Sequence, residues 1–248
     1  MNRPAPKMLT VIDKAQISLN MVRVTLHGRE LDERIHWHPG GYVKLVIPNS
    51  NVPGKKPKVR TYTARSFDPQ KQTMTIDFAI HQPAGPATSW AINAQEGDEI
   101  AMMGLGKLKL DPSKGDWYLF AADMSAIPAA LSVMESLGPD AKGYAILEIM
   151  DERDKQTLAI PEGFEVQWLI HPTPETKSEQ QLAAIKNIHV MAGIANIFVA
   201  GELSTIREIK RYITTKESFK DAFRYISSYW KIGLKEEEHK EAKRRELR

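Results

Sequence analysis

The sequence predicts six antiparallel strands, forming a β-barrel or a β-sandwich, followed by an α/β domain built on a parallel sheet. Up to about Leu110, short runs of alternating apolar and polar residues are separated by Pro and Gly, which is typical of antiparallel strands. Beyond that point, apolar strand-like runs alternate with helical patterns, which indicates parallel strands joined by crossover helices. The turn-rich segment 111–115 separates the two patterns. We therefore expect domains at 1–112 and 113–234, followed by a charged tail at 235–248.

The individual elements follow from the same patterns. The expected barrel strands are 10–17, 22–27, 42–47, 59–64, 73–79 and 99–103. A short helix is expected to begin near Pro86 and to carry Trp90 into the core. In the second domain the expected strands are 117–121, 144–150, 165–170 and 197–200, and the expected helices are 126–137, 178–186 and 204–214. The tail predicts a solvated helix held by i,i+4 ion pairs, with a partner-binding surface as the alternative.

Composition excludes several kinds of chemistry. The 248 residues include no cysteine, so disulfides, thiolate nucleophiles and cysteine-ligated metal centres are excluded, and redox chemistry requires an organic cofactor or other metal ligands. His36 and His38 lack a carboxylate at ligand spacing, so we expect surface histidines and no metal site. The start of the chain shows no signal-peptide pattern, and no apolar run reaches membrane-spanning length. We expect a cytoplasmic protein with no membrane partner. The net charge of +3 does not indicate a nucleic-acid partner.

One expected strand carries Arg60, Thr61, Tyr62 and Thr63. Strand alternation places Arg60 and Tyr62 on one face, about 7 Å apart. A guanidinium suits a phosphate, a tyrosine ring can stack on a planar heterocycle, and Thr63 offers a hydroxyl and a backbone N–H to a ring nitrogen. Together these groups meet the needs of a flavin nucleotide. The alternative is an ordinary exposed strand.

A second candidate segment follows about twenty residues later. Gly85 and Pro86 introduce the short helix, and a helix N-terminus presents free N–H groups that suit a pyrophosphate. Thr88 and Ser89 could add hydroxyl donors. The alternative is a loop and helix that only close one end of the barrel.

An ordered set of motifs extends these two segments along the chain. In order they are Arg60-x-Tyr62-Thr63-x-Arg65, Asp77-Phe78, His81, Gly85-Pro86-Ala87, Trp90-Ala91, Gly97-Asp98, Ala122-Asp123-x-x-Ala126-x-Pro128-Ala129, Ala200-Gly201-Glu202 and Tyr229-Trp230-x-x-Gly233. This set resembles the siderophore-interacting proteins, which are FAD-containing ferric-siderophore reductases of the ferredoxin-reductase-like superfamily. The resemblance runs from about Thr10 to Gly233. It implies a six-stranded antiparallel flavin-binding barrel followed by a parallel-sheet nicotinamide-binding domain.

The resemblance implies which residues bind the cofactors. For FAD they are Arg60, Thr61, Tyr62, Thr63, Asp77, His81, Gly85, Pro86, Ala87, Thr88 and Ser89. For NADH or NADPH they are Asp123, Ser125, Ala126, Gly201 and Glu202, with Trp230 as an aromatic that approaches the flavin ring. Ala122 and Met124 stand where the family has Gly and Glu. Glu202 as a favourable helix start and Trp230 as a helix packing anchor are the alternatives. The segment 151–154 contains both acidic residues and Arg153, so it does not choose between the two nicotinamide coenzymes.

Basic residues near the expected flavin strand predict the substrate site. Lys55, Lys56 and Lys58 lead into Arg60, and they would attract an anionic iron chelate, with Lys44 and Arg65 as further candidates. The alternative is a solubilising loop. The resulting hypothesis is a monomeric enzyme that passes electrons from NAD(P)H through FAD to a ferric siderophore, the flavin rather than a catalytic side chain carrying the chemistry. A flavin- or ferredoxin-type reductase with another acceptor, or a non-catalytic siderophore-binding protein, is the alternative.

Overall fold

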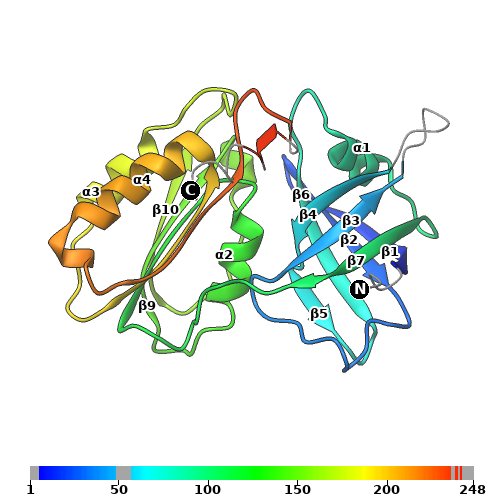
Figure 1. The fold of residues 1–248 in the computed structure, drawn as a ribbon, viewed down its shortest axis with the longest axis horizontal. Helices are drawn as coiled ribbons and strands as arrows, with labels where there is room; N and C mark the ends of the chain where they lie inside the picture. Colours follow the sequence, from blue (N-terminus) through cyan, green and yellow to red (C-terminus); the bar gives the residue numbers. More distant parts are fainter. Residues whose placement is uncertain (1–5, 49–56, 236–237, 240, 242–248) are drawn as a thin grey trace. The chain divides into compact units, whose positions relative to one another are not determined.

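The computed structural model describes residues 6–48, 57–235, 238–239 and 241. The chain divides into two compact units, Met1–Leu108 and Lys109–Arg248, and each is described by itself. The division falls just before the turn-rich segment 111–115 (Figure 1).

The first unit is an antiparallel sheet with the strand order β4-β3-β7-β1-β2-β6-β5. Its strands are β1 (Lys7–Ser18), β2 (Met21–His27), β3 (Tyr42–Ile47), β4 (Lys58–Thr63), β5 (Ser66–Asp68), β6 (Thr73–Ala79) and β7 (Glu99–Gly106). The short β5 is one strand more than the six expected. It continues directly from β4, and Arg65 N donates to Thr75 O at 2.9 Å between them. Because β4 pairs with β3 while β5 pairs with β6, this bent segment joins the two ends of the sheet.

Alternation along the strands fills the barrel with apolar side chains. Val43, Leu45 and Phe78 are fully buried in one cluster with α1 (Pro86–Asn93), the helix expected at Pro86. The Phe78 ring contacts two other aromatic rings. Its centroid is 4.4 Å from that of Tyr62 and 5.8 Å from that of Trp90, so β4, β6 and α1 meet in one core.

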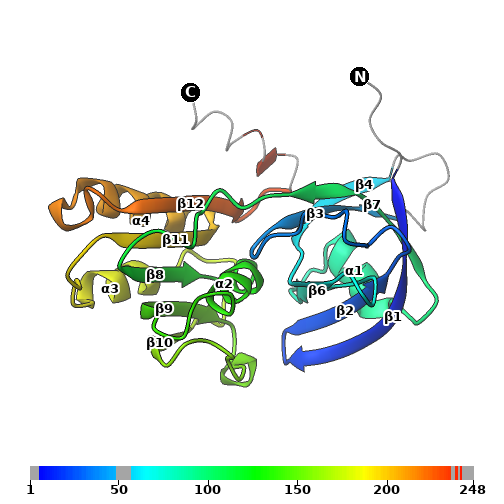
Figure 2. The same cartoon turned by 90° about the horizontal axis from the view of Figure 1, so that it is seen from below.

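The second unit is a five-stranded parallel sheet with the order β10-β9-β8-β11-β12 (Figure 2). Its strands are β8 (Trp117–Ala122), β9 (Lys142–Ile149), β10 (Gly163–Ile170), β11 (Ala195–Glu202) and β12 (Phe223–Trp230). The order reverses between β8 and β11, which marks the point where open α/β sheets bind ligands. The sequence patterns did not predict β12. The alternative reading of Trp230 as a helix packing anchor is wrong, because Trp230 ends this strand. The residues of β12 are mostly half-buried and of mixed polarity, so they form no apolar run.

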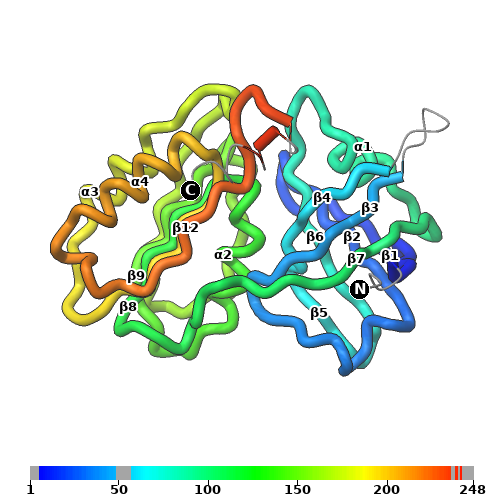
Figure 3. Tube along the Cα trace, viewed as in Figure 1, coloured from blue at the N-terminus to red at the C-terminus, as the bar shows by residue number. Residues whose placement is uncertain are grey.

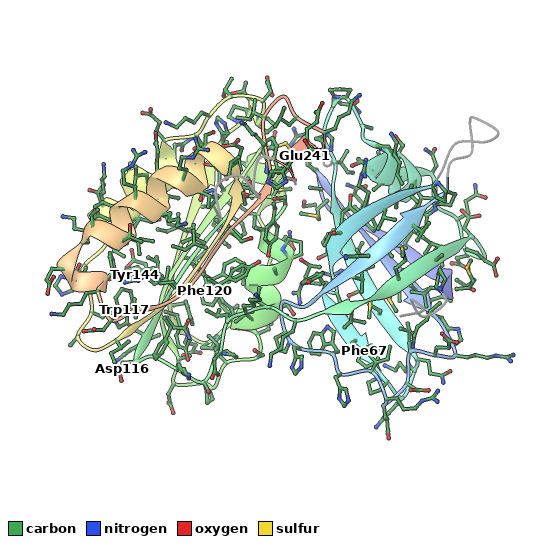
Figure 4. All side chains as sticks on the ribbon, in the orientation of Figure 1. Phe67, Asp116, Trp117, Phe120, Tyr144 and Glu241 are labelled. Atoms are coloured by element: carbon green, nitrogen blue, oxygen red, sulfur yellow. The ribbon has the colours of Figure 1, made fainter. Side chains whose placement is uncertain are left out.

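Helices cover both faces of this sheet (Figure 3). They are α2 (Ile127–Met134), α3 (Gln180–Asn187) and α4 (Leu203–Thr215), with short 3-10 turns η1 (Glu152–Asp154) and η2 (Glu217–Phe219). Trp117 and Tyr144 pack edge to face at 6.2 Å on the side of α3 and α4, while Phe120 lies on the other side (Figure 4). All eight residues of α2 are buried.

Part of the charged tail belongs to this second unit. Glu238, His239 and Glu241 are helical, as expected, but His239 is buried and its Nε2 lies 3.0 Å from Ser228 Oγ on β12. A fully solvated tail is therefore wrong at this position. Within the described ranges, no helix combines the length and apolar character that crossing a membrane requires.

Candidate functional site

Strand pairing fixes which way the side chains of β4 face. Arg60 is opposite Leu45 and Tyr62 is opposite Val43, so both share the face of the fully buried β3 residues. The Tyr62 ring rests on Phe78, and the half-buried Arg60 donates to Val59 O at 3.1 Å. Thr61 is exposed on the opposite face of β4, and Thr63, on that same face, is buried.

Asp77 lies at the centre of a charged cluster on β6. Its carboxylate accepts two hydrogen bonds from Arg23, at 2.7 and 2.8 Å, and the Nε of Arg65 is 3.7 Å away. Arg65 thus lies in a largely buried ion-pair cluster, whereas the sequence analysis named it as a further candidate for attracting the iron chelate. Arg23 was missed by the sequence analysis. A basic residue among the apolar residues of β2 was the available signal.

The N-terminus of α1 is open to an anion. Its N-cap is Gly85, without a side-chain hydrogen bond to the helix, and the first turn contains no acidic residue. A Cβ at Gly85 would meet only the His81 ring, at 3.9 Å. The Thr88 hydroxyl points inward, 3.4 Å from Ala79 O and from His81 Nε2, whereas Ser89 is half-buried. Pro86 has no N–H, so the backbone N–H groups of Ala87 and Thr88, rather than the Thr88 hydroxyl, suit a phosphate.

The proposed substrate lysines are not brought to one face. Lys44 is exposed on β3 opposite Thr61, while Lys58 is exposed at the start of β4 opposite Ile47. These two pairs lie on alternate faces of the sheet. Lys55 and Lys56 lie outside the described residues.

In the second unit, Asp123 follows β8 at the point where the strand order reverses. Its Oδ1 accepts from Ser125 N at 2.9 Å and from Ser125 Oγ at 2.6 Å. Its Oδ2 accepts from Glu202 N and from Trp230 Nε1, both at 2.8 Å. Burial raises the pKa of the Asp123 carboxyl, and these hydrogen bonds oppose that rise. Two predicted coenzyme contacts, Asp123 and Glu202, thus meet at one edge of the sheet together with Trp230, which the sequence analysis placed near the flavin ring.

Glu202 begins α4 as its N-cap. Its carboxylate accepts from Ser204 N at 2.6 Å, from Thr205 N at 3.1 Å and from Ser204 Oγ, and its other oxygen accepts from Ile232 N at 3.3 Å. Gly201 precedes it with φ of +150°, and a Cβ there would lie 2.5 Å from Asp123 Oδ2. Glycine is therefore required for the close approach of the two strand ends.

Glu148 is a second buried carboxylate at this edge, on β9. Ser178 Oγ donates to its Oε2, and Thr205 Oγ1 donates to Ser178 O at 3.2 Å. Burial raises the pKa of Glu148, and the negative charge of nearby Asp123 raises it further. The sequence analysis missed Glu148, although an acidic residue within an apolar strand was a visible signal.

The loop after β9 contains an internal ion pair. Arg153 Nε and Nη2 donate to the two Asp151 oxygens at 2.8 and 2.9 Å, which lowers the pKa of Asp151. Asp151 and Asp154 also form a reciprocal cap of η1. The acidic and basic groups of this loop thus bind one another, and the loop still does not choose between NADH and NADPH.

The two units differ in how well they fit a dinucleotide phosphate. The barrel has an uncapped helix N-terminus, the guanidinium of Arg60 and a supported Tyr62 ring, so its residues fit FAD. At the turn into α2, the N–H groups of residues 125–127 are bound by Asp123, and Pro128 has none. The turn into α4 is capped by Glu202. A coenzyme at this edge therefore needs donors other than these two turns.

Comparisons with known proteins agree with this division. The family model described as siderophore-interacting protein matches residues 115–233, and the model described as siderophore-interacting FAD-binding domain matches residues 50–107. The ferric vibriobactin reductase ViuB of Vibrio cholerae is 30% identical, over 96% of this chain and 94% of ViuB. This chain belongs to the siderophore-interacting protein family.

The chain is also similar to a further relative and to solved structures. The NADPH-dependent ferric-chelate reductase of Escherichia coli is 26% identical over 90% of this chain and 91% of its own. The crystal structure of a siderophore utilization protein from T. fusca has a TM-score of 0.80 and 27% identity, covering 95% of this chain and 96% of that one. Ferredoxin-NADP+ reductase from Plasmodium falciparum, at 13% identity and a TM-score of 0.62, shares the fold, with coverage of 90% and 96%. The chain is thus an NAD(P)H- and FAD-dependent flavoprotein by family and fold.

The raised pKa of Glu148 predicts a pH-dependent stability. A folded state that binds the proton more tightly than the unfolded chain is most favoured below the ordinary pKa of 4.5, and it loses that advantage as pH rises through the folded pKa. We expect Glu148→Gln, which cannot ionise, to gain stability relative to the natural protein as pH rises. Urea midpoints at about pH 5 and about pH 8 would measure this difference.

Glu165→Gln is the matched control, because Glu165 is exposed on the neighbouring β10. Its midpoints should follow those of the natural protein at both pH values. Parallel pH profiles for Glu148→Gln and the natural protein would contradict the assignment of a costly buried charge to Glu148.

Proposed function

We propose that this protein is a ferric-siderophore reductase, which uses NAD(P)H as reductant and FAD as its bound cofactor. The observation that carries the proposal is the uncapped N-terminus of α1, in the same core as the Tyr62 ring. That core joins a phosphate-binding helix end to a strand that presents a guanidinium and an aromatic ring. The chain belongs to the siderophore-interacting protein family and is similar to a ferric vibriobactin reductase, and both findings support a ferric siderophore as the electron acceptor.

Each barrel group has a separate part in holding the flavin nucleotide. We assign the phosphates to Arg60 and to the backbone N–H groups of Ala87 and Thr88 in the first turn of α1. Tyr62 offers its ring to the heterocycle and cannot tilt freely, because Phe78 supports it at 4.4 Å. Thr61 and Thr63 offer polar groups from the other face of β4. His81 lies against the start of α1 and is assigned to the phosphate or adenosine end.

The bound flavin would supply the redox chemistry, since it can take a hydride from NAD(P)H and pass on single electrons. One NAD(P)H then reduces two Fe(III) to two Fe(II) and releases one proton. Hard oxygen donors hold Fe(II) less tightly than Fe(III) because its charge is lower, so reduction loosens the metal. The chain itself contributes binding, orientation and electrostatics, and no acid–base side chain is required.

The acceptor site is assigned to basic residues near the flavin strand. Lys44 on the Thr61 face of the sheet and Lys58 on the Arg60 face are both exposed, and an anionic chelate would be attracted to either charge. Lys55 and Lys56 belong to the same proposal. The proposal also includes that the protein works as a monomer in the cytoplasm. The absence of cysteine is consistent with a reducing compartment.

The decisive experiment is an absorbance spectrum of the purified protein, followed by addition of NADH or NADPH with a ferric siderophore and a ferrous trap. We expect a flavin spectrum, and coenzyme oxidation that produces the ferrous complex at two irons per coenzyme. A colourless protein that takes up no FAD would overturn the flavoprotein assignment. Coenzyme oxidation without ferrous product would point to a reductase with another acceptor.

Replacing Arg60 should weaken flavin binding. Arg60→Ala removes the guanidinium assigned to the phosphates, and hydrogen bonds to charged groups contribute about 1.5–3 kcal/mol each. We expect the FAD dissociation constant to rise on the order of tenfold to a hundredfold. Flavin fluorescence titration of the apoprotein measures it. Arg34→Ala is the control, since Arg34 is exposed in the same unit and pairs with Asp32. Equal affinities for both variants would remove Arg60 from the site.

Reversing the charge of Lys44 should affect the acceptor alone. Lys44→Glu is expected to raise KM for an anionic ferric siderophore several-fold, most strongly at low ionic strength, because the attraction is screened by salt. KM for NAD(P)H and the flavin content should not change. Lys210→Glu, on the exposed side of α4, controls for net charge. A loss that is the same at all salt concentrations would argue against electrostatic attraction.

A further inference from the structure

We infer that Asp123 is a positioning residue, which fixes the Trp230 indole and the Gly201–Glu202 turn at the carboxyl edge of the parallel sheet instead of contacting the coenzyme itself. The inference rests on the proposed function in one respect, namely that this edge receives NAD(P)H. It changes the role expected for Asp123 from a ligand to a support.

The first argument is that the carboxylate is already fully used. Four protein donors, from Ser125, Glu202 and Trp230, occupy its two oxygens at 2.6–2.9 Å. Asp123 is 8% exposed, so little of it can reach a ligand. A negative group at this turn also repels a pyrophosphate. Direct binding of the coenzyme phosphates by this side chain is therefore unfavourable on both counts.

The second argument is that the donors come from three different strand ends. Ser125 follows β8, Glu202 ends β11 and Trp230 ends β12. The Trp230 indole N–H reaches the same oxygen as the Glu202 backbone N–H. One oxygen atom thus determines both where the indole lies and where the chain enters α4.

The third argument is the fit of Gly201 against the carboxylate. A side chain at position 201 would place its Cβ 2.5 Å from Asp123 Oδ2 and 2.7 Å from Cγ. The strand ends of β8 and β11 are therefore as close as a glycine allows. Gly201→Ala would displace the carboxylate without changing any charge.

The support continues away from Asp123 toward β9. Glu202 accepts from Thr205 N, Thr205 Oγ1 donates to Ser178 O, and Ser178 Oγ donates to Glu148. A continuous line of hydrogen bonds therefore runs along the carboxyl edge from β12 to β9. Such a line fixes a binding surface without using a ligand to do so.

A double-mutant cycle with Asp123→Asn and Trp230→Phe tests the inference. Asparagine keeps one accepting oxygen for the four donors, so the contacts of Ser125, Glu202 and Trp230 cannot all be kept. We expect each single variant to weaken binding of NADP⁺ or NAD⁺, measured by calorimetry, on the order of tenfold, and the double variant to lose no more. Losses that multiply would show that Asp123 acts on the coenzyme independently, which would overturn the inference.

A spectroscopic arm keeps the test decisive if coenzyme binding fails. The fluorescence emission of Trp230 is obtained by subtracting the spectrum of Trp230→Phe from that of the natural protein. We expect Asp123→Asn or Gly201→Ala to shift this emission toward that of a hydrated indole. Unchanged Trp230 emission would overturn the inference, whether or not the natural protein binds a coenzyme. Failure of the natural protein to bind NAD⁺ or NADP⁺ would instead contradict the proposed use of NAD(P)H.

Asp116→Asn is the matched control. Asp116 immediately precedes β8, where Asp123 immediately follows it, and its Oδ2 likewise accepts a backbone hydrogen bond, from Ile194 N at 2.7 Å. It lies at the amino end of the strand, away from the coenzyme edge. Its replacement should leave both coenzyme binding and Trp230 emission unchanged. Equal effects at Asp116 and Asp123 would reduce the role of Asp123 to general stability.

Discussion

The α/β unit depends on a carboxylate that is buried and stabilised by neutral donors. Removing a carboxylate from water is costly, and only hydrogen bonds or opposite charges can offset that cost. For Asp123 the donors are two backbone N–H groups, a hydroxyl and an indole. The Ser125 donors are local, but Glu202 and Trp230 are far from Asp123 in the sequence, so their donors reach it only when β8, β11 and β12 are paired in the correct register. The cost of burying the Asp123 carboxylate is thus offset only when the strand ends adopt this one arrangement.

The helix N-termini of the two units are used in opposite ways. The α1 N-terminus has a glycine N-cap and no acidic residue in its first turn, so its N–H groups are available to an anion. The turns into α2 and α4 are bound by Asp123 and Glu202. The same physical feature therefore serves as a ligand site in the barrel and as an internal contact in the sheet. A resident cofactor needs tight binding, whereas a coenzyme that must leave after each turnover does not, and this difference is consistent with the two arrangements.

The sequence predicts the elements better than the roles of their residues. Alternation located β3 and β6 at their observed bounds, and Gly85-Pro86 located α1, because these signals are local. It did not locate β12, whose half-buried residues lack an apolar run, nor β5, which is three residues long. Roles depend on partners that are distant in the chain. The pairing of Asp77 with Arg23 joins residues on two strands, and the contact of Trp230 with Asp123 spans most of the second unit. No local pattern encodes such contacts.

The position of the proposed flavin strand follows from its relation to β6. Asp77 and Phe78 are neighbours in sequence, so they face opposite sides of the sheet. Phe78 supports the Tyr62 ring from the core side, while Asp77 lies 3.7 Å from Arg65, which follows β4, on the other side. The backbone N–H of Arg65 also donates to β6. A slip of one residue in β6 would bring the Asp77 carboxylate into the core and the Phe78 ring out of it, so both contacts depend on the register of β6. The groups proposed to hold the flavin are therefore placed by a strand that contributes little to the binding surface itself.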